Sequence, residues 1–204
     1  MASKIIVDQL EKTGGALAAL TLPAANATAN QILKNDGAGA LSWTDSGGKV
    51  LNVVTTTVTS AATSTSSTTF EDLPGVTVTI SPTAATSKVL IFINLQVSGS
   101  GGGGVMVPMR LLRDSTPIFI GDQLGSNRGR GAFNHRASSE QELGNYSGTY
   151  YDETISTTSA TVYKMQWCTE TGSYYGQLNQ ANAGSDILKY STGCSSITVM
   201  EIGV

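Results

Sequence analysis

The sequence is poor in charged residues, and this scarcity already restricts its function. Asp, Glu, Lys and Arg make up 13% of the 204 residues, against about 25% in typical globular domains. Twelve basic and fifteen acidic side chains leave a formal net charge of -3. A nucleic-acid-binding protein needs a basic surface, so we expect no nucleic-acid partner. One histidine and two distant cysteines, with no Asp-rich loop, also predict that the chain binds no metal and needs no cofactor.

Long apolar runs are absent as well. The longest, Val89–Ile93, is far too short to cross a bilayer, so we expect no membrane insertion. Asp8 interrupts the N-terminus before any long apolar stretch, which predicts no signal peptide and folding in a cytoplasm. Cys168 and Cys194 have no zinc-site or CxxC spacing. A single disulfide between them stays open, but their strand-like surroundings favour two buried free thiols.

The residues that are abundant are those of β-structure. Ser and Thr are frequent, there are 23 glycines, and Thr and Val suit a pleated surface. Short apolar segments alternate with Gly, Pro, Asn and Asp, and no segment has the period of a convincing amphipathic helix. This pattern predicts an all-β protein whose main domain is a jelly-roll-like β-sandwich.

The expected strands are short and regularly spaced. They cover residues 49–59, 76–80, 88–97, 105–112, 118–120, 146–155, 162–168, 174–178, 187–190 and 196–202. The segment 88–97 is apolar at nearly every position up to Asn94, which predicts a central strand buried on both faces. Residues 121–145 are polar and are predicted to form a long loop, with at most one helical turn at 138–143.

The composition changes near Gly47-Gly48, which predicts two domains, 1–48 and 49–204. In the first, apolar residues come in ones and twos between small residues, and residues 31–43 have the pattern of a β-hairpin with a turn at Asn35-Asp36-Gly37. One hairpin is marginally stable alone. This arm is therefore either disordered or completed by other copies of the chain, and its regular Leu, Ile and Trp favour copies packed around a shared axis.

Several segments resemble fibre proteins of tailed bacteriophages, especially phages of aquatic bacteria. The likeness lies in MASKIIVDQL at 1–10, LP at 22–23, ANQIL at 29–33, DGAGALSW at 36–43 and GKVL at 48–51. Residues 75–82, 87–91, 110–114 and 197–202 are similar to strands of the distal β-domain of the same fibres. Each motif is simple, but their order is specific, and together they cover most of the chain.

The resemblance implies a homotrimeric virion component that is assembled in the host cytoplasm. An extended, trimerising N-terminal arm would dock on a tail, baseplate or capsid protein, and we assign the attachment to Ile5, Ile6, Val7 and Leu10. Residues 49–204 would form a β-sandwich tip. The family attaches at different places, so tail and capsid both stay open.

Catalysis is not expected from these residues. The single histidine, His135, lies between Asn134 and Arg136 in a polar stretch and is predicted to be a surface residue. No GxSxG elbow is present, and the glycine-rich stretch 99–104 lacks the Gly-Lys-Ser/Thr ending of a phosphate loop. Asp152 and Glu153 are adjacent on an expected strand and so point to opposite faces.

Receptor recognition is the function that the loops favour. Tyr rings stack on sugars, whereas Arg and Asn bind hydroxyl and acidic groups. The candidates are Asn127, Arg128, Arg130, His135, Arg136, Tyr146, Tyr150, Tyr151, Tyr174 and Tyr175. The competing interpretation is that the tyrosines pack between sheets or subunits and that the arginines only face solvent.

Three functional hypotheses follow. The first is a non-enzymatic phage fibre whose tip binds a glycan or protein on the bacterial surface. The second is a purely structural fibre that decorates the capsid or links the baseplate. The third is a polysaccharide depolymerase acting through Glu140 or Asp152, which is the least favoured because the sequence offers no paired carboxylates suited to glycoside hydrolysis.

Overall fold

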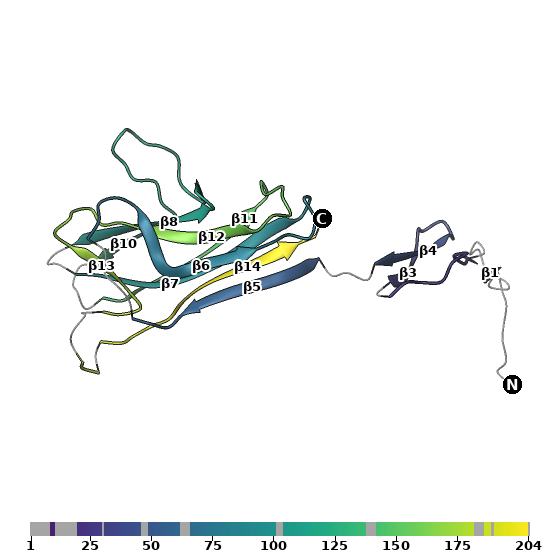
Figure 1. The fold of residues 1–204 in the computed structure, drawn as a ribbon, viewed down its shortest axis with the longest axis horizontal. Coiled ribbons are helices and arrows are strands. Elements are labelled where there is room, and N and C mark those ends of the chain that lie inside the picture. The colour runs from purple at the N-terminus through teal and green to yellow at the C-terminus, as the bar shows by residue number, and fades with distance from the viewer. Residues whose placement is uncertain are drawn as a thin grey trace. The chain divides into compact units, whose positions relative to one another are not determined.

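The chain divides into two compact units, Met1–Gly48 and Lys49–Val204 (Figure 1). The computed structural model describes residues 9–10, 20–29, 31–45, 49–61, 66–100, 104–137, 142–181, 186–188 and 190–203. Within these ranges every regular element is a β-strand, and none is a helix, so the expected all-β class is confirmed. The division between the units falls at Gly48–Lys49, where the composition of the sequence changes.

The N-terminal unit contains the expected hairpin. Strand β3 (Gln31–Asn35) pairs antiparallel with β4 (Leu41–Asp45). The Asp36 carboxylate caps the turn by accepting hydrogen bonds from the backbone of Ala38 and Ala40, at 2.7 and 3.1 Å. The turn needs Gly37, whose φ of +86° is unfavourable for other residues.

Short strands precede the hairpin, and its apolar side chains are left uncovered. Strand β1 (Gln9–Leu10) pairs with β2 (Leu20–Thr21). Ile32 and Leu33 are 52% and 43% exposed. Of the four residues predicted to attach the arm to the virion, Ile5, Ile6 and Val7 lie outside the described residues, and Leu10 pairs with Leu20 in β1.

The C-terminal unit consists of two antiparallel sheets, which we name after their inner strands. The β7 sheet has the order β11-β7-β14-β5, with β13 paired to β7, and the β8 sheet has the order β10-β8-β12-β6, with β9 paired to β8. Their bounds are β5 Val50–Val58, β6 Glu71–Ile80, β7 Lys88–Ser100, β8 Val105–Arg113, β9 Thr116–Ile118, β10 Phe133–Ala137, β11 Gly144–Asp152, β12 Thr161–Trp167, β13 Tyr175–Leu178 and β14 Ser195–Ile202.

The chain crosses from one sheet to the other at six of the nine connections between these strands. Strands β5, β7, β11 and β14 belong to the β7 sheet, and β6, β8, β10 and β12 belong to the β8 sheet. The last strand, β14, lies between β5 and β7, and β12 lies between β6 and β8. This order is the connection pattern of a jelly roll, in which two Greek keys fold over each other. At one end the backbone N–H of Gly203 donates to the carbonyl of Lys49 at 2.7 Å, and we call this the linker end.

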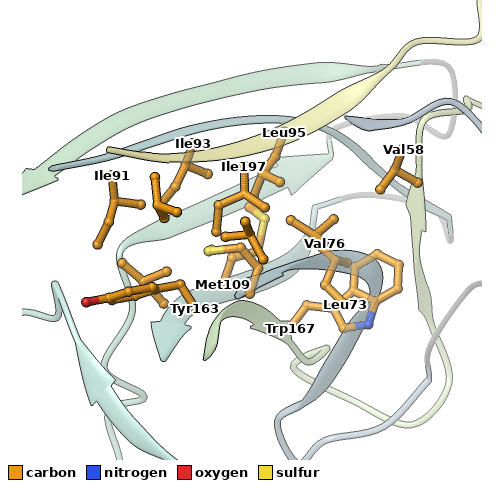
Figure 2. Packing of buried hydrophobic residues seen from close by; sticks show 14 of the residues in the cluster. Val58, Leu73, Val76, Ile91, Ile93, Leu95, Met109, Tyr163, Trp167 and Ile197 are labelled. Atoms are coloured by element: carbon orange, nitrogen blue, oxygen red, sulfur yellow. The ribbon is translucent and has the colours of Figure 1, made fainter. Parts of the chain in front are cut away.

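A single apolar core fills the space between the sheets (Figure 2). Ile91, Ile93 and Leu95 of β7 face Met109 of β8, and Trp167 of β12 closes the core beside Leu73. Ile91, Leu95, Met109 and Trp167 are at most 1% exposed. The alternation of buried and partly exposed residues along β8, β12 and β14 is the period of strands covered on one face.

Several sequence predictions need correction. Strand β7 is central, but it is not buried on both faces, because Phe92 on its outer side is 39% exposed. The predicted strand at 187–190 is absent from its described residues, and Leu188 is fully exposed. The strand expected at 118–120 ends at Ile118, because Phe119 adopts a φ of +51°. The polar stretch 121–145 contains a strand, β10.

Both cysteines are free thiols, as the sequence favoured. Cys168 is buried, whereas Cys194 is exposed, so the expectation that both are buried is wrong for Cys194. Cys194 follows Gly193 just before β14 begins, which leaves its side chain outside the covered part of the strand.

Candidate receptor-binding surface

One long loop projects from the side of the sandwich, between β9 and β10 (Figure 1, teal). The chain leaves the β8 sheet at Phe119, whose positive φ turns the backbone away from β9. It returns where the N–H of Ala132 donates to the carbonyl of Met109 at 2.8 Å. Residues 121–130 are exposed throughout. Loops carried by a rigid sheet framework are the usual place for binding residues.

Polar contacts within this loop fix its shape. Arg130 Nε donates to the carbonyl of Gly121 at 2.6 Å, which ties the two halves of the loop together. Gln123 Nε2 donates to the carbonyl of Arg128 at 3.2 Å. One of the guanidinium donors of Arg130 is therefore already used within the loop. The side chain of Arg128 makes no hydrogen bond within the described part of the chain and is available to a ligand.

Hollows open on two sides of the loop. One has a volume of about 450 Å³ and is lined by Pro108, Phe133, Asn134 and Arg128 together with small residues of the returning chain. The other, about 480 Å³, lies between the loop and Tyr150 of β11. Both volumes fall in the range of roughly 300–1,000 Å³ that is usual for small-molecule sites. The first hollow combines a guanidinium, an amide and apolar rings.

Beneath the loop, aromatic rings join the edges of the two sheets. Phe119 lies 5.2 Å from Tyr150 and 6.1 Å from Phe133, and Phe133 lies 6.2 Å from Tyr146, measured between ring centroids. A Cβ atom at Gly148 would lie 2.6 Å from Phe133 Cζ, so the cluster needs glycine there. Tyr146 and Tyr150, two of the receptor candidates, therefore pack between the sheets.

His135 is not a surface residue, and this prediction is wrong. The side chain is 2% exposed, and Nδ1 lies 2.7 Å from the Tyr146 hydroxyl. Strand alternation explains the error: in β10 the neighbours Asn134 and Arg136 point outward, which turns the ring of His135 into the sandwich. Nε2 of His135 has no hydrogen-bond partner among the described residues.

Acidification is expected to destabilise the protein through His135. Burial lowers the pKa of His135 below its usual 6.5, although the charge of Glu142 opposes the shift. The unfolded chain therefore takes up a proton before the folded one does, so this contribution to stability is present above pH 6.5 and is lost as the pH falls below it. We expect a lower urea midpoint at pH 5.5 than at pH 7.5.

The measurement has an internal control, because the chain contains one histidine. In a His135→Gln variant the difference between the two midpoints should largely disappear, whatever the absolute stability of the variant. An equal difference in the variant and the wild type would contradict this role of His135.

The remaining receptor candidates do not gather with the loop. Tyr151 is 39% exposed and lies on the outer side of the β7 sheet, opposite Leu90. Tyr175 is 38% exposed and pairs with Ser100 at the end of the sandwich far from the linker, whereas Tyr174 packs partly against the core. Arg136 is exposed on the outer side of the β8 sheet. Asn127, Arg128 and Arg130 therefore lie in one loop, and Tyr150 lines the hollow beside it. His135 and Tyr146 contact each other within the sandwich, and the other candidates lie apart from the loop.

Comparison with known proteins adds little at this point. No family model matches the chain, and no curated protein matches it. Among solved structures it is similar to a chain in the structure of the Gx strain of infectious bursal disease virus, with 12% identity and a TM-score of 0.32. The match covers 93% of this chain and 50% of the viral chain, so our chain spans about half the length of that neighbour. We base no argument on a similarity of this size.

Two polar side chains are buried in the sandwich, and the sequence analysis did not predict their burial. The Asp152 carboxylate, fully buried, accepts hydrogen bonds from Arg113, Tyr163 and Thr154. Asn179, also fully buried, has a φ of +58°. Its side chain and backbone form hydrogen bonds with three segments of the chain, at 58–60, Gln96 and 193–195. Glu153 beside Asp152 is exposed, which confirms that the two carboxylates point to opposite faces. Both buried groups stabilise the fold rather than meet a ligand.

Other kinds of site find no support in the described ranges. No group of three or more His, Cys, Asp or Glu side chains lies close enough there to hold a metal ion. Across the same ranges no helix has the length and apolarity to cross a membrane.

Proposed function

We propose that this chain is a non-enzymatic bacteriophage fibre protein, a homotrimer in the virion whose C-terminal unit binds the surface of the bacterial host. The fibre assignment is supported by the ordered resemblance of residues 1–51 and of the later strands to such fibres. Residues 1–48 serve as the trimerising arm that docks on a tail, baseplate or capsid protein. The binding role is supported by the exposed loop between β9 and β10, which is the observation that carries the proposal.

The chemistry of the loop suits an acidic glycan. A guanidinium forms paired hydrogen bonds with a carboxylate or phosphate, and Arg128 has no partner inside the described part of the protein. Asn134 offers an amide to sugar hydroxyls, and Phe133 and Pro108 give the same hollow an apolar wall. A protein receptor with an acidic segment would use the same groups. Three such sites on one fibre would convert weak single contacts into strong attachment.

Catalysis is not part of the proposal. The depolymerase hypothesis depended on Glu140, which lies outside the described residues, or on Asp152. The carboxylate of Asp152 has no exposed surface and already accepts hydrogen bonds from three side chains. A substrate has no access to it in this fold. Release of new reducing ends from host polysaccharide would contradict this part of the proposal.

Removing the Arg128 guanidinium is expected to weaken binding to host cells. We expect Arg128→Ala in the full-length protein to lower the affinity about tenfold or more, as is usual for a central interface arginine. Arg128→Lys keeps the charge but loses the paired geometry, so its affinity should fall between those of wild type and Arg128→Ala. The measurement is binding of labelled protein to host cells and to unrelated cells over a range of concentrations.

Arg136→Ala is the matched control, because it removes the same charge from another exposed arginine of the unit. Its affinity should stay near that of the wild type. Equal losses in both variants would reduce the effect to overall charge and contradict a site at the loop. Equal wild-type binding to host and unrelated cells would remove the receptor role, and particles lacking the protein that still adsorb normally would favour the purely structural fibre.

A further inference from the structure

The two outer faces of the sandwich differ in chemistry. Side chains that point outward from the β8 sheet include four charged residues, Asp72, Arg110, Arg136 and Lys164. Three of them form a continuous network. Lys164 Nζ and Gln166 Nε2 each donate to the Asp72 carboxylate at 2.7 Å, and Arg110 donates to Gln166 Oε1 and lies 4.0 Å over the Phe70 ring. A face of this kind is well suited to contact with water.

The outer face of the β7 sheet carries no such network. Its outward side chains can be followed across the four strands in register. One row is Tyr151, Leu90, Met200 and Val53, the next is Thr149, Phe92, Thr198 and Thr55, and the third is Ser147, Asn94, Ser196 and Thr57. None of these twelve described side chains is ionisable near neutral pH. Lys88, at the linker end, directs its ammonium to the carbonyl of Glu153 at 2.7 Å.

Apolar side chains at one end of this face are left in water. Val53 is 50% exposed, Phe92 is 39% exposed and Leu51 is 44% exposed. Soluble monomers rarely expose a contiguous apolar patch beyond a few hundred Å² unless it binds something. The patch also reaches an open edge, because β5 pairs only with β14. The sequence of β5, VLNVVTTTV, contains none of the Lys, Pro or charged residues that usually protect an edge strand.

We propose that the outer face of the β7 sheet is where copies of this chain pack against each other. The inference rests on the homotrimer of the proposed function and assigns the surface that holds its C-terminal units together. Further copies of the chain are the occupant that fits. When three copies turn this face toward a shared axis, the three rows bring no charges together that would repel, whereas a charged partner finds no ion pair in them. The hydroxyls and amides of the third row are both donors and acceptors and so can pair with their own equivalents.

The three rows supply about half of the area that a stable interface takes from each partner. Four strands about 4.8 Å apart and three rows of residues, spaced about 3.3 Å per residue, give the face a projected area of roughly 380 Å². A stable interface takes about 800 Å² of accessible surface from each partner. The corrugated side chains and the open edge of β5 supply part of the remainder. The exposed Ile32 and Leu33 of the N-terminal unit supply more when the arms associate.

Two methionines provide a test on the unmodified full-length protein. Met200 points outward from the β7 sheet and Met106 points outward from the β8 sheet, and both are partly exposed in one chain. We expect brief treatment with dilute peroxide, followed by mass spectrometry, to oxidise Met106 at least about tenfold faster than Met200. Similar oxidation rates would overturn the proposal. Protection of Met200 that appears only on adding host polysaccharide would assign the face to a glycan and would also overturn it.

A charge introduced on this face tests the same interface, because loss of the interface lowers the mass of the assembly in solution. Thr198→Lys puts an ammonium between Phe92 and Thr55, and burying it between copies should weaken association roughly 100-fold or more. Thr79→Lys is the matched control, because Thr79 points outward from β6 in the other sheet. In sedimentation equilibrium we expect wild type and Thr79→Lys at three times the 21.1 kDa chain mass, and Thr198→Lys at lower mass with unchanged circular dichroism.

The outcomes separate the two proposals. If Thr198→Lys is still a trimer and Met200 is oxidised as fast as Met106, the proposed interface on the β7 sheet is wrong. The homotrimer would then be held together by the N-terminal arm. A wild type at a single chain mass would overturn both the face and the homotrimer. Binding to host cells is measured independently of either result. If Thr198→Lys does not fold, Phe92→Glu and the oxidation of the unmodified protein decide the question.

Discussion

Replacing Asp152 by alanine is expected to lower the free energy of unfolding by about 3–5 kcal/mol, the usual cost of breaking a buried ion pair. Arg113 Nη1 lies 2.8 Å from both carboxylate oxygens, and the Tyr163 hydroxyl donates to Oδ2 at 2.8 Å. Alanine leaves a guanidinium and a fully buried phenol without their acceptor. For a domain of this size the loss corresponds to a decrease in Tm of roughly 10 °C, measurable by calorimetry.

Glu153→Ala is the control for this variant. Glu153 is the next residue, but it is exposed and should change the stability by less than about 0.5 kcal/mol. Asp152→Asn keeps the shape and one acceptor oxygen, so its stability should lie between those of wild type and Asp152→Ala. A loss below 1 kcal/mol for Asp152→Ala would contradict the buried network.

The same carboxylate gives the fold a defined sensitivity to acid. Burial raises the pKa of Asp152, but hydrogen bonds from Tyr163, Thr154 and Arg113 outweigh it and hold the pKa below its usual 3.8. The stabilisation is therefore fully present above pH 3.8 and is lost as the pH falls through the lower, folded-state value. The difference in stability between wild type and Asp152→Asn should shrink between pH 5 and pH 3, and a constant difference would contradict this assignment.

Replacing Asn179 by alanine is expected to cost about 3–5 kcal/mol as well, for two separate reasons. The side-chain amide donates to the carbonyl of Val58 at 2.8 Å and to that of Ser60 at 3.2 Å, and its oxygen accepts from the Ser195 hydroxyl at 2.6 Å. Partners left unsatisfied in the interior cost about 1–3 kcal/mol. The φ of +58° adds roughly 1–2 kcal/mol for alanine, because asparagine tolerates this region better.

Asn179→Gly separates these two terms. Glycine relieves the backbone cost but not the lost hydrogen bonds, so it should be about 1 kcal/mol more stable than Asn179→Ala. Asn127→Ala, an exposed position in the β9–β10 loop, serves as the control and should be nearly neutral. Equal stability of the alanine and glycine variants, measured by urea unfolding, would remove the backbone contribution.

Features of the candidate site could be predicted from the sequence where they depend on neighbouring residues, but not where they depend on contacts between distant segments. Asn127, Arg128 and Arg130 were named as binding candidates because Asn and Arg in a polar, Gly-rich stretch can bind hydroxyl and acidic groups, and this is a local signal. Along β11 every second residue points to the same face, so Tyr146 and Tyr150 lie on the same face as buried Asp152. The sequence of β11 alone does not show which of its two faces is turned toward the core. His135 was misjudged because a five-residue strand with polar neighbours has the composition of a loop.

The sequence by itself determined the β class and the hairpin predicted at 31–43, because backbone preferences, turn glycines and alternation act over a few residues. Only the tertiary structure decided which strand faces are covered. The sheet partners of β14, for example, are β5 and β7, about a hundred residues or more away along the chain. Burial of His135, Asp152 and Asn179 depends on such distant contacts. The contrast between the charged outer face of the β8 sheet and the outer rows of the β7 sheet also depends on distant contacts. The register of the strands aligns residues that lie far apart in the sequence.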